Sequence, residues 1–226
     1  VIIQETGAVK VPDDMPLDLA CLIGCAVQTG VGAVLNTAGV REGDTVLVMG
    51  LGGVGLSVVQ GARVAGASRI LVSDPVAERR NRALAMGATH ALDPATDDLV
   101  TAAHDLSPEG IGVDRAFDAA GRSSLVVTGL DATRKGGTTV MVGVPRLDDP
   151  LTYPLPAVLA VGGKKLLGCL LGSCNSLRDI PRMVALAQTG QLDLAALVTA
   201  RRPLADINLA LDDLRTGTGV RTVIDL

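Results

Sequence analysis

The stretch Thr45-Val-Leu-Val-Met-Gly-Leu-Gly-Gly-Val-Gly-Leu-Ser57 decides the fold of this 226-residue chain. An apolar run rich in β-branched residues, 45–49, leads into glycines spaced as GxGxxG, and a helical rhythm of apolar residues follows. Gly50 permits a tight turn, Gly52 leaves room for backbone to approach a pyrophosphate, and Gly55 lets the helix pack closely on the strand. The helix N-terminus then points unpaired N–H groups at the phosphates. The stretch therefore predicts a strand–turn–helix unit that binds a dinucleotide.

An acidic residue closes the next apolar run. Asp74 follows the expected strand 69–73 and can accept hydrogen bonds from the adenosine ribose hydroxyls. An ordinary strand-to-helix turn also contains glycines, but the flanking strand, the helix and this acid together favour a dinucleotide site. The charge of Asp74 repels a 2′-phosphate and predicts NAD. Arg79 and Arg80 leave NADP open, because an arginine near the ribose can accept that phosphate; both also suit a solvated helix face.

Composition restricts the class of protein. The chain is 48% hydrophobic, and its only aromatic residues of the Phe, Tyr and Trp types are Phe117 and Tyr153, which suits a buried parallel sheet of aliphatic residues. A net charge of −4 without a basic cluster argues against nucleic acid. We see no apolar stretch of the roughly 18 residues that a membrane span needs, and expect no membrane partner. The four cysteines form no CxxC pair and indicate reduced thiols in a cytoplasmic protein.

Strands and helices alternate from residue 41 onward. This alternation predicts βαβ units, and hence a doubly wound parallel sheet with helices on both faces. The expected strands are 45–49, 69–73, 90–92, 113–119 and 138–144, and the expected helices are 53–65, 77–86, 97–106 and 123–134.

Two flanks break the alternation and predict parts of a second domain. Before it, 18–38 reads as helices divided near Gly24 and Thr29-Gly30. After it, the proline-rich segment 148–156 reads as an irregular connection. The remaining expected elements are a strand at 165–171, helices at 180–188, 192–197 and 205–214, and a final strand at 221–226.

Several segments together resemble the C-terminal part of the zinc-containing, medium-chain alcohol dehydrogenases, with the liver-type and glutathione-dependent formaldehyde dehydrogenase branches most similar. The segments lie in family order at family-like spacing across the whole chain. They are Cys21-Leu-Ile-Gly-Cys25, Thr29-Gly30, Gly50-Leu-Gly-Gly-Val-Gly55, Val72-Ser-Asp74, Met86-Gly-Ala-Thr89, Val142-Gly-Val-Pro145 and Gly219-Val-Arg-Thr-Val-Ile224.

The resemblance implies a domain plan. Residues 1–25 would end a catalytic domain, 26–170 would form the NAD-binding Rossmann domain, and 171–226 would return to the catalytic domain. Most of that catalytic domain would precede Val1, with the other ligands of a catalytic zinc. The family also implies a homodimer or homotetramer, with contacts often near 165–171.

The resemblance also implies a role for each matching residue. Thr29, the one catalytic candidate, would lie beside the nicotinamide, with Val54 packed behind the ring. Cys25 would be the third protein ligand of the zinc; from spacing alone it is more simply a small apolar residue, as Cys21 is. The other implied cofactor contacts are Gly50, Gly52, Gly53, Gly55 and Arg221 at the pyrophosphate, Asp74, Arg79, Ala119 and Ala120 at the adenosine ribose, and Val142, Gly143, Val144 and Leu171 at the carboxamide.

The implied activity is hydride transfer between a primary or secondary alcohol or aldehyde and NAD, with zinc as the Lewis acid. This chain would be the cofactor-binding half and inactive alone. Two alternatives stay open within the fold: a zinc-free NADP-dependent reductase resembling quinone oxidoreductases, which Cys25 disfavours, and a non-catalytic NAD-binding fragment. A methyltransferase shares glycine loops of this kind, but the segment 142–145 and Arg221 disfavour it.

Overall fold

Six strands form one parallel sheet in the order β3-β2-β1-β4-β5-β6. The computed structural model describes residues 2–226; Val1, the first residue of the expected 1–25 segment, lies outside the described residues. The strand order reverses between β1 and β4, as in doubly wound folds, so the predicted fold class is confirmed. The strands are β1 (Thr45–Met49), β2 (Arg69–Ser73), β3 (His90–Leu92), β4 (Val113–Asp118), β5 (Thr133–Met141) and β6 (Lys165–Gly168).

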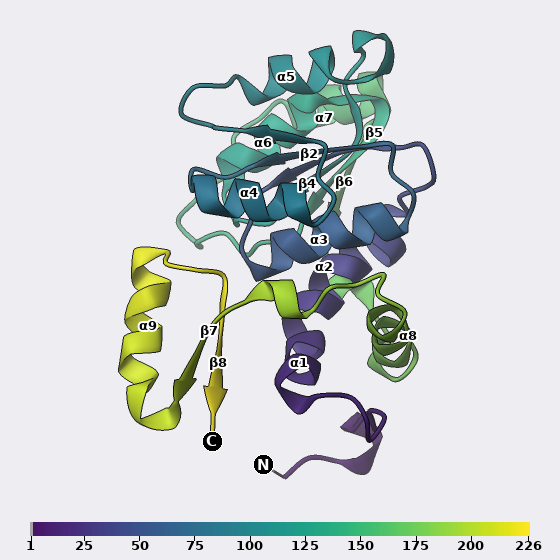
Figure 1. Ribbon diagram of the computed structural model, residues 1–226. Helices are drawn as coiled ribbons and strands as arrows, with labels where there is room; N and C mark the ends of the chain where they lie inside the picture. The colour runs from purple at the N-terminus through teal and green to yellow at the C-terminus, as the bar shows by residue number, and fades with distance from the viewer. Residues whose placement is uncertain (1) are drawn as a thin grey trace.

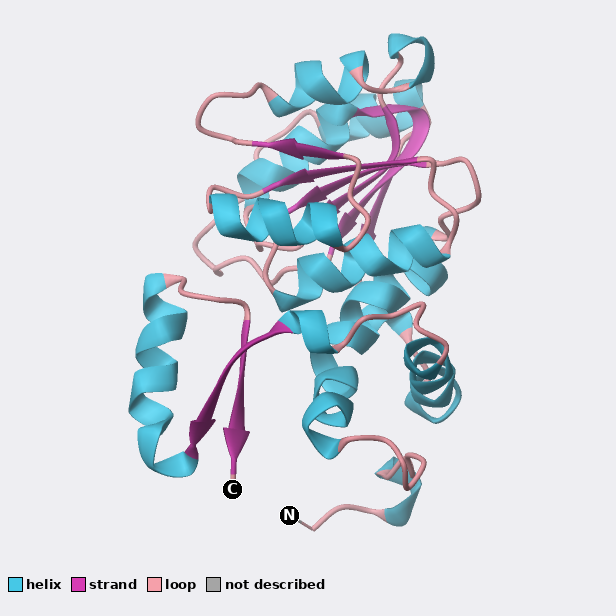
Figure 2. Cartoon of the chain, in the orientation of Figure 1, coloured by secondary structure: helices cyan, strands magenta, loops and turns pink. Residues whose placement is uncertain are grey.

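Helices cover both faces of this sheet (Figures 1 and 2). Side chains alternate along β1: Val46 and Val48 join one core cluster, whereas Leu47 and Met49 join the other. The first cluster includes α3 and α4, and the second α5 and α6. All five residues of β1 are buried, as a central parallel strand requires. The helices of this domain are α3 (Gly53–Val64), α4 (Ala77–Ala85), α5 (Leu99–Asp105), α6 (Ser123–Ala132) and α7 (Leu155–Gly162), with a 3₁₀ turn η4 (Pro108–Gly110).

One continuous helix, Leu17–Ala38, precedes the sheet, where the sequence predicted divided helices. Gly30 does not break it: a Cβ on Gly30 would lie 2.5 Å from the Cβ of Ser57, so the missing side chain lets this helix pack closely on α3. Its parts are α1 (Leu17–Leu22), the π-helical η2 (Ile23–Val27), α2 (Gln28–Gly32) and the π-helical η3 (Ala33–Ala38).

This helix is also long and apolar enough to cross a membrane, so the expectation that no such stretch exists is wrong. However, 61% of its apolar window is buried inside the protein, and Val27, Val31 and Val34 belong to the first core cluster. Its apolarity is therefore accounted for by packing within the fold.

The strand β5 begins five residues before its predicted start. The sequence predicted a helix up to residue 134, but Gly136, at φ +74°, lies inside the strand, where the register between β4 and β5 shifts. A β-bulge of this kind favours glycine within a strand. Helix α7 follows the proline-rich connection and was not predicted, whereas β6 ends three residues earlier than expected.

The C-terminal segment forms a smaller unit beside the sheet (Figure 1). Two parallel strands pair within it, and the first of them was not predicted. The elements of this unit are β7 (Val198–Pro203), η7 (Leu204–Asp206), α9 (Ile207–Thr216) and β8 (Arg221–Asp225). The segment between β6 and this unit contains η5 (Leu171–Ser173), α8 (Ser176–Gln188) and η6 (Ala195–Leu197). A short 3₁₀ turn, η1 (Glu5–Gly7), lies near the N-terminus.

Candidate functional site at the carboxyl edge of the sheet

Two of the three motif glycines are required by the fold itself. Gly50 has φ +91°, and a Cβ there would lie 2.9 Å from Ala120. A Cβ on Gly55 would lie 1.8 Å from the carbonyl oxygen of Gly50. Gly52 differs, because its backbone suits any residue and a Cβ would have nothing within 4 Å. Neither packing nor backbone conformation therefore explains why position 52 is a glycine, and the space beside it is open.

Asp74 is buried at the tip of β2, with 4% of its surface exposed. Its carboxylate accepts the N–H of Leu51 and the N–H of Val76, each at 2.8 Å. The first bond ties the strand tip to the glycine loop. Each carboxylate oxygen keeps a second lone pair, so Asp74 can still accept from a ligand hydroxyl.

Arg79 connects this corner to the C-terminal unit. Its Nη1 lies 3.9 Å from Oδ2 of Asp74, and its Nη2 donates to the carbonyls of Gly217 and Gly219 at 2.7 and 3.1 Å. The guanidinium is thus held by the loop between α9 and β8. Arg80 is engaged elsewhere, in an ion pair with Asp93 at 2.8 Å.

Arg221 lies against the N-terminus of α3. A Cβ on Gly53 would meet its Nε at 2.0 Å, so the guanidinium occupies the space beside that glycine. Nε is buried and has no hydrogen-bond partner. A cation beside the positive end of a helix, with an unpaired buried donor, is an arrangement that a bound anion would stabilise.

The loops after β4 and β5 interlock at the same edge. Val142 and Gly143 donate their N–H groups to the carbonyl of Asp118 at 2.9 and 2.8 Å, and a Cβ on Gly143 would lie 2.2 Å from the nitrogen of Gly121. Ala119 and Ala120 belong to the first of these loops. Val142 is buried, but Val144 is 90% exposed and is therefore not part of the sheet core.

Asp118 organises these loops and was not singled out from the sequence. Its carboxylate is 1% exposed and accepts the N–H groups of Ala120, Gly121 and Arg122 at 2.9 to 3.1 Å. Burial raises the pKa of Asp118 by more than these bonds lower it. The sequence did contain a signal for Asp118, because it is an acidic residue at the end of an apolar strand, as Asp74 is.

The residues expected near the nicotinamide also come together. A Cβ on Gly30 would lie 2.5 Å from the carbonyl oxygen of Val54, and a Cβ on Gly172 would lie 3.0 Å from that of Thr29. These close backbone approaches place Thr29, Val54 and the turn that begins at Leu171 next to one another. Thr29 is 8% exposed and Leu171 is 45% exposed.

Cys25 lies four residues before Thr29 on the same helix, exposed on the π-helical segment η2. Among residues 2–226 there is no group of three or more His, Cys, Asp or Glu side chains that could hold a metal ion. A catalytic zinc needs about three protein ligands. The donors of the described chain therefore do not fit a zinc centre by themselves, and Cys25 stays a predicted ligand.

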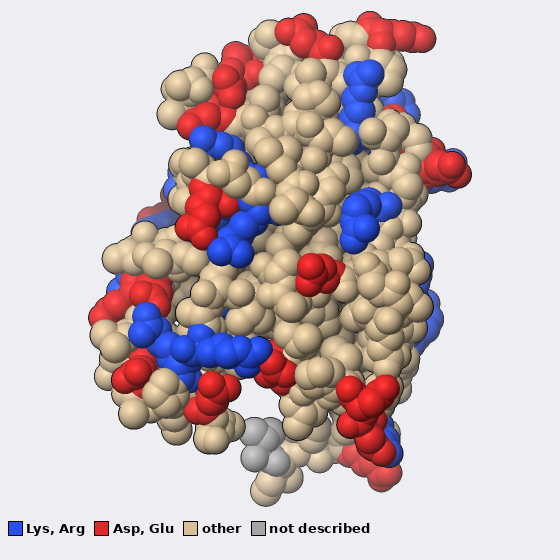
Figure 3. All heavy atoms as spheres, in the orientation of Figure 1, with Lys and Arg blue, Asp and Glu red and all other residues tan. Residues whose placement is uncertain are grey.

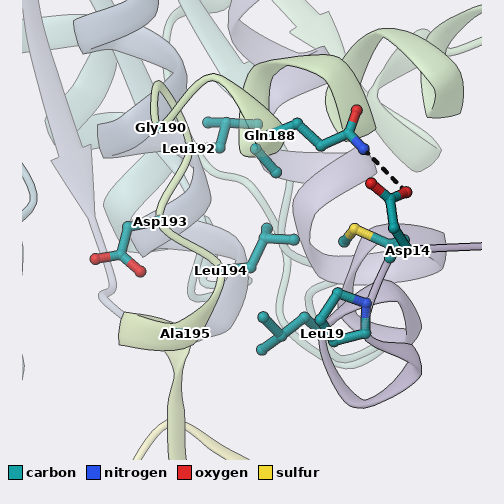
Figure 4. A pocket seen from close by; sticks show the side chains of 11 residues that line it. Asp14, Leu19, Gln188, Gly190, Leu192, Asp193, Leu194 and Ala195 are labelled. Carbon is teal, nitrogen blue, oxygen red and sulfur yellow. Dashed lines mark hydrogen bonds between the residues drawn. The ribbon is translucent and has the colours of Figure 1, made fainter. Parts of the chain in front are cut away.

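A hollow of about 410 Å³ lies away from the carboxyl edge, between the N-terminal segment and the end of α8 (Figure 4). Asp14 accepts a hydrogen bond from Gln188 across its rim at 3.5 Å. None of the predicted site residues lines this hollow. On the face shown in Figure 3, basic and acidic side chains lie among one another rather than gathered by sign.

Comparison with known proteins places these features in a family context. A family model described as zinc-binding dehydrogenase matches residues 53–189. The chain is 38% identical over 224 residues to an NDMA-dependent alcohol dehydrogenase of Amycolatopsis methanolica and 36% identical over 225 residues to an S-(hydroxymethyl)glutathione dehydrogenase of Synechocystis sp.. These matches cover 98% and 99% of this chain but 60% of each relative.

Solved structures agree with the sequence matches. The crystal structure of benzyl alcohol dehydrogenase from Acinetobacter calcoaceticus aligns with a TM-score of 0.93 and 34% identity. The alignment covers 99% of this chain and 60% of that one. The chain therefore spans about three fifths of the length of these relatives.

Proposed function

This chain belongs to the zinc-binding dehydrogenase family, and we propose that it binds NAD across the carboxyl edge of its sheet as the cofactor-binding part of an alcohol dehydrogenase. The reaction would be hydride transfer between a primary or secondary alcohol or aldehyde and the nicotinamide. Residues 26–170 would form the cofactor domain, with 1–25 and 171–226 as parts of the catalytic domain.

The observation that carries the proposal is the pair formed by Gly52 and Arg221. Gly52 leaves a space that neither packing nor backbone conformation demands, and Arg221 leaves a buried donor unpaired beside the first turn of α3. A pyrophosphate would occupy that space and accept from that donor. The Gly53 N–H, at the same helix end, would add a third contact.

NAD is favoured over NADP by the surroundings of Asp74. Its carboxylate is fixed by two backbone N–H groups at the strand tip, where the ribose would lie, and would repel a 2′-phosphate. Arg79 and Arg80, which could otherwise accept that phosphate, are occupied by the carbonyls of the 217–219 loop and by Asp93.

The chain's own residues would bind and orient the cofactor. NAD itself supplies the hydride acceptor. Val54 would support one side of the ring, and Thr29 would lie beside the reacting face. Ala119 and Ala120 would follow the adenosine ribose, and the loop from Val142 to Val144 would face the carboxamide. Because the described residues do not complete a zinc site, we expect the 226-residue chain to bind NAD without oxidising alcohol.

Calorimetric titration of the folded chain with NAD, NADH and NADP tests the proposal. We expect NAD and NADH to bind, and NADP to bind at least about tenfold more weakly. Gly52→Ala should weaken NAD binding about tenfold or more without changing the melting temperature, since its Cβ meets only open space in the free protein. Gly7→Ala is the matched control, because a Cβ there also meets nothing within 4 Å. Folded chain that releases no heat with NAD or NADH would contradict the proposal.

A further inference from the structure

Three consecutive residues after β6 adopt a left-handed backbone. The φ angles are +47° at Leu171, +70° at Gly172 and +51° at Ser173. Glycine accepts this conformation readily, but leucine and serine do so at a cost in free energy. The turn Leu171–Ser173 therefore keeps its shape only because its surroundings hold it.

Backbone packing supplies one part of that support. A Cβ on Gly172 would lie 2.3 Å from the carbonyl oxygen of Gln28, and a Cβ on Gly32 would lie 2.5 Å from the carbonyl oxygen of Gly172. The turn thus lies directly on α2, next to Thr29.

Side chains from the following helical turn, η3, supply the other part. The Asn36 amide Nδ2 lies 3.4 Å from the carbonyl oxygen of Gly172 and 3.3 Å from Sγ of Cys174. The neighbouring Thr37 hydroxyl lies 2.8 Å from that of Ser173. Adjacent side chains of one helix therefore hold the middle and the end of the strained turn.

The same Asn36 amide reaches a buried charge at the start of α8. Nδ2 lies 3.5 Å from Oδ2 of Asp179, a carboxylate that is 1% exposed and also accepts the N–H of Asn175 at 2.8 Å. A hydrogen-bonded ion pair with Arg178 holds the pKa of Asp179 below its ordinary value, so this acceptor stays charged. Asn36 therefore joins the turn to the first turn of α8.

We propose that Asn36 is a positioning residue, which holds the Leu171–Ser173 turn in the left-handed conformation that sets Leu171 beside Thr29 for the nicotinamide end of the cofactor. The inference rests on the proposed function, because the turn matters to binding only if NAD lies across this edge. It assigns to Asn36 an effect on the nicotinamide half of the ligand and none on the adenosine half.

Binding of NAD and of ADP-ribose separates these halves, since ADP-ribose lacks the nicotinamide ring. By calorimetry on the 226-residue chain, Asn36→Ala should weaken NAD about three- to tenfold, the range for one lost hydrogen bond, and leave ADP-ribose within about twofold. Asn208→Ala, at an exposed helical asparagine of α9, is the matched control and should change neither. Equal weakening of both ligands, or of neither, would overturn the proposal.

A rescue variant tests the role of backbone conformation. Ser173→Gly removes the cost of φ +51° at that residue and also the hydroxyl contact to Thr37, so Ser173→Gly alone is measured as the reference for the double variant. Added to Asn36→Ala, it should restore at least half of the lost NAD affinity on a logarithmic scale, and failure to restore any would count against positioning through the turn. Wild-type chain that binds neither NAD nor ADP-ribose would instead refute the proposed function. Wild-type chain that binds ADP-ribose as tightly as NAD would refute this inference alone.

Discussion

The six-stranded sheet and the C-terminal unit of β7, β8 and α9 are both built on parallel strands, yet they bury their side chains to different degrees. Every residue of β1 is buried, whereas β7 has none and β8 has one buried residue. Parallel strands are stable when both faces are covered. The sheet has helices on both faces, but the C-terminal unit leaves apolar side chains of α9 exposed, among them Leu209 at 51% and Leu214 at 64%.

The difference teaches how each region is held in place. The sheet carries its own hydrophobic core. The C-terminal unit adds Val220 to the first core cluster and packs Val198 of β7 against it, but most of its apolar side chains lie outside that cluster. Polar links also tie the unit to the rest of the chain: Arg79 to the 217–219 loop, and Arg201 of β7 to Asp18 of α1. Stability should therefore respond to apolar truncation in the sheet and to the loss of single polar groups around the C-terminal unit.

The largest expected effect is a matched pair of leucine truncations. Leu47→Ala removes a fully buried side chain from β1 and should lower the free energy of unfolding by about 3 kcal/mol. Leu214→Ala, at a 64% exposed position of α9, should change it by less than about 0.5 kcal/mol. Urea denaturation followed by circular dichroism measures both. Similar losses in the two variants would show that the C-terminal unit has a core of comparable strength.

An intermediate effect is expected from the polar link at Arg79. Arg79→Ala removes hydrogen bonds of 2.7 and 3.1 Å to the 217–219 loop. Charged hydrogen bonds of this kind contribute about 1.5 kcal/mol or more, so amide exchange in β8 should become about tenfold faster. Exchange in β1 should stay unchanged in the same hydrogen-exchange experiment.

Arg82→Ala is the control for this experiment, because Arg82 lies on the same helix and pairs with Glu78 of that helix. Uniform acceleration over β1 and β8 in Arg79→Ala would mean that the two regions open together, and the distinction between them would fail.

The same contrast explains how much the sequence could predict. β1 and β2 have their predicted bounds, because a short apolar run between polar residues is a local signal. Asp74 was found for a related reason, since its distance from Gly55 is fixed by one helix and one strand. β7 escaped prediction because Thr199, Arg201 and Arg202 make it look like a polar loop, and its partner β8 lies about twenty residues away.

Long-range contacts account for what was missed in the site. Asn36 meets Gly172 across 136 residues of sequence, and nothing in its own helix distinguishes it from a surface asparagine. The left-handed φ of Leu171 and Ser173 was equally hidden, since neither residue type favours that conformation. The motif residues were predictable because their reasons are local, whereas the supports of the turn depend on the folded chain.

The smallest expected effect is a pH response of opposite sign in the two regions. Burial raises the pKa of Asp118 in the sheet above its ordinary 3.8, so acidification from that raised value toward 3.8 should stabilise wild type relative to Asp118→Asn. The hydrogen bond from Arg201 lowers the pKa of Asp18, so that link is present above pH 3.8 and is lost as the pH falls through the lowered value. Wild type should therefore lose stability relative to Asp18→Asn over that lower range.

Free energies of unfolding of the three proteins, measured from neutral pH down to about pH 3, give both slopes, because neither asparagine titrates. Slopes of the same sign would mean that acidification changes the contributions of Asp118 and Asp18 to stability in the same direction, and the contrast would not extend to electrostatics.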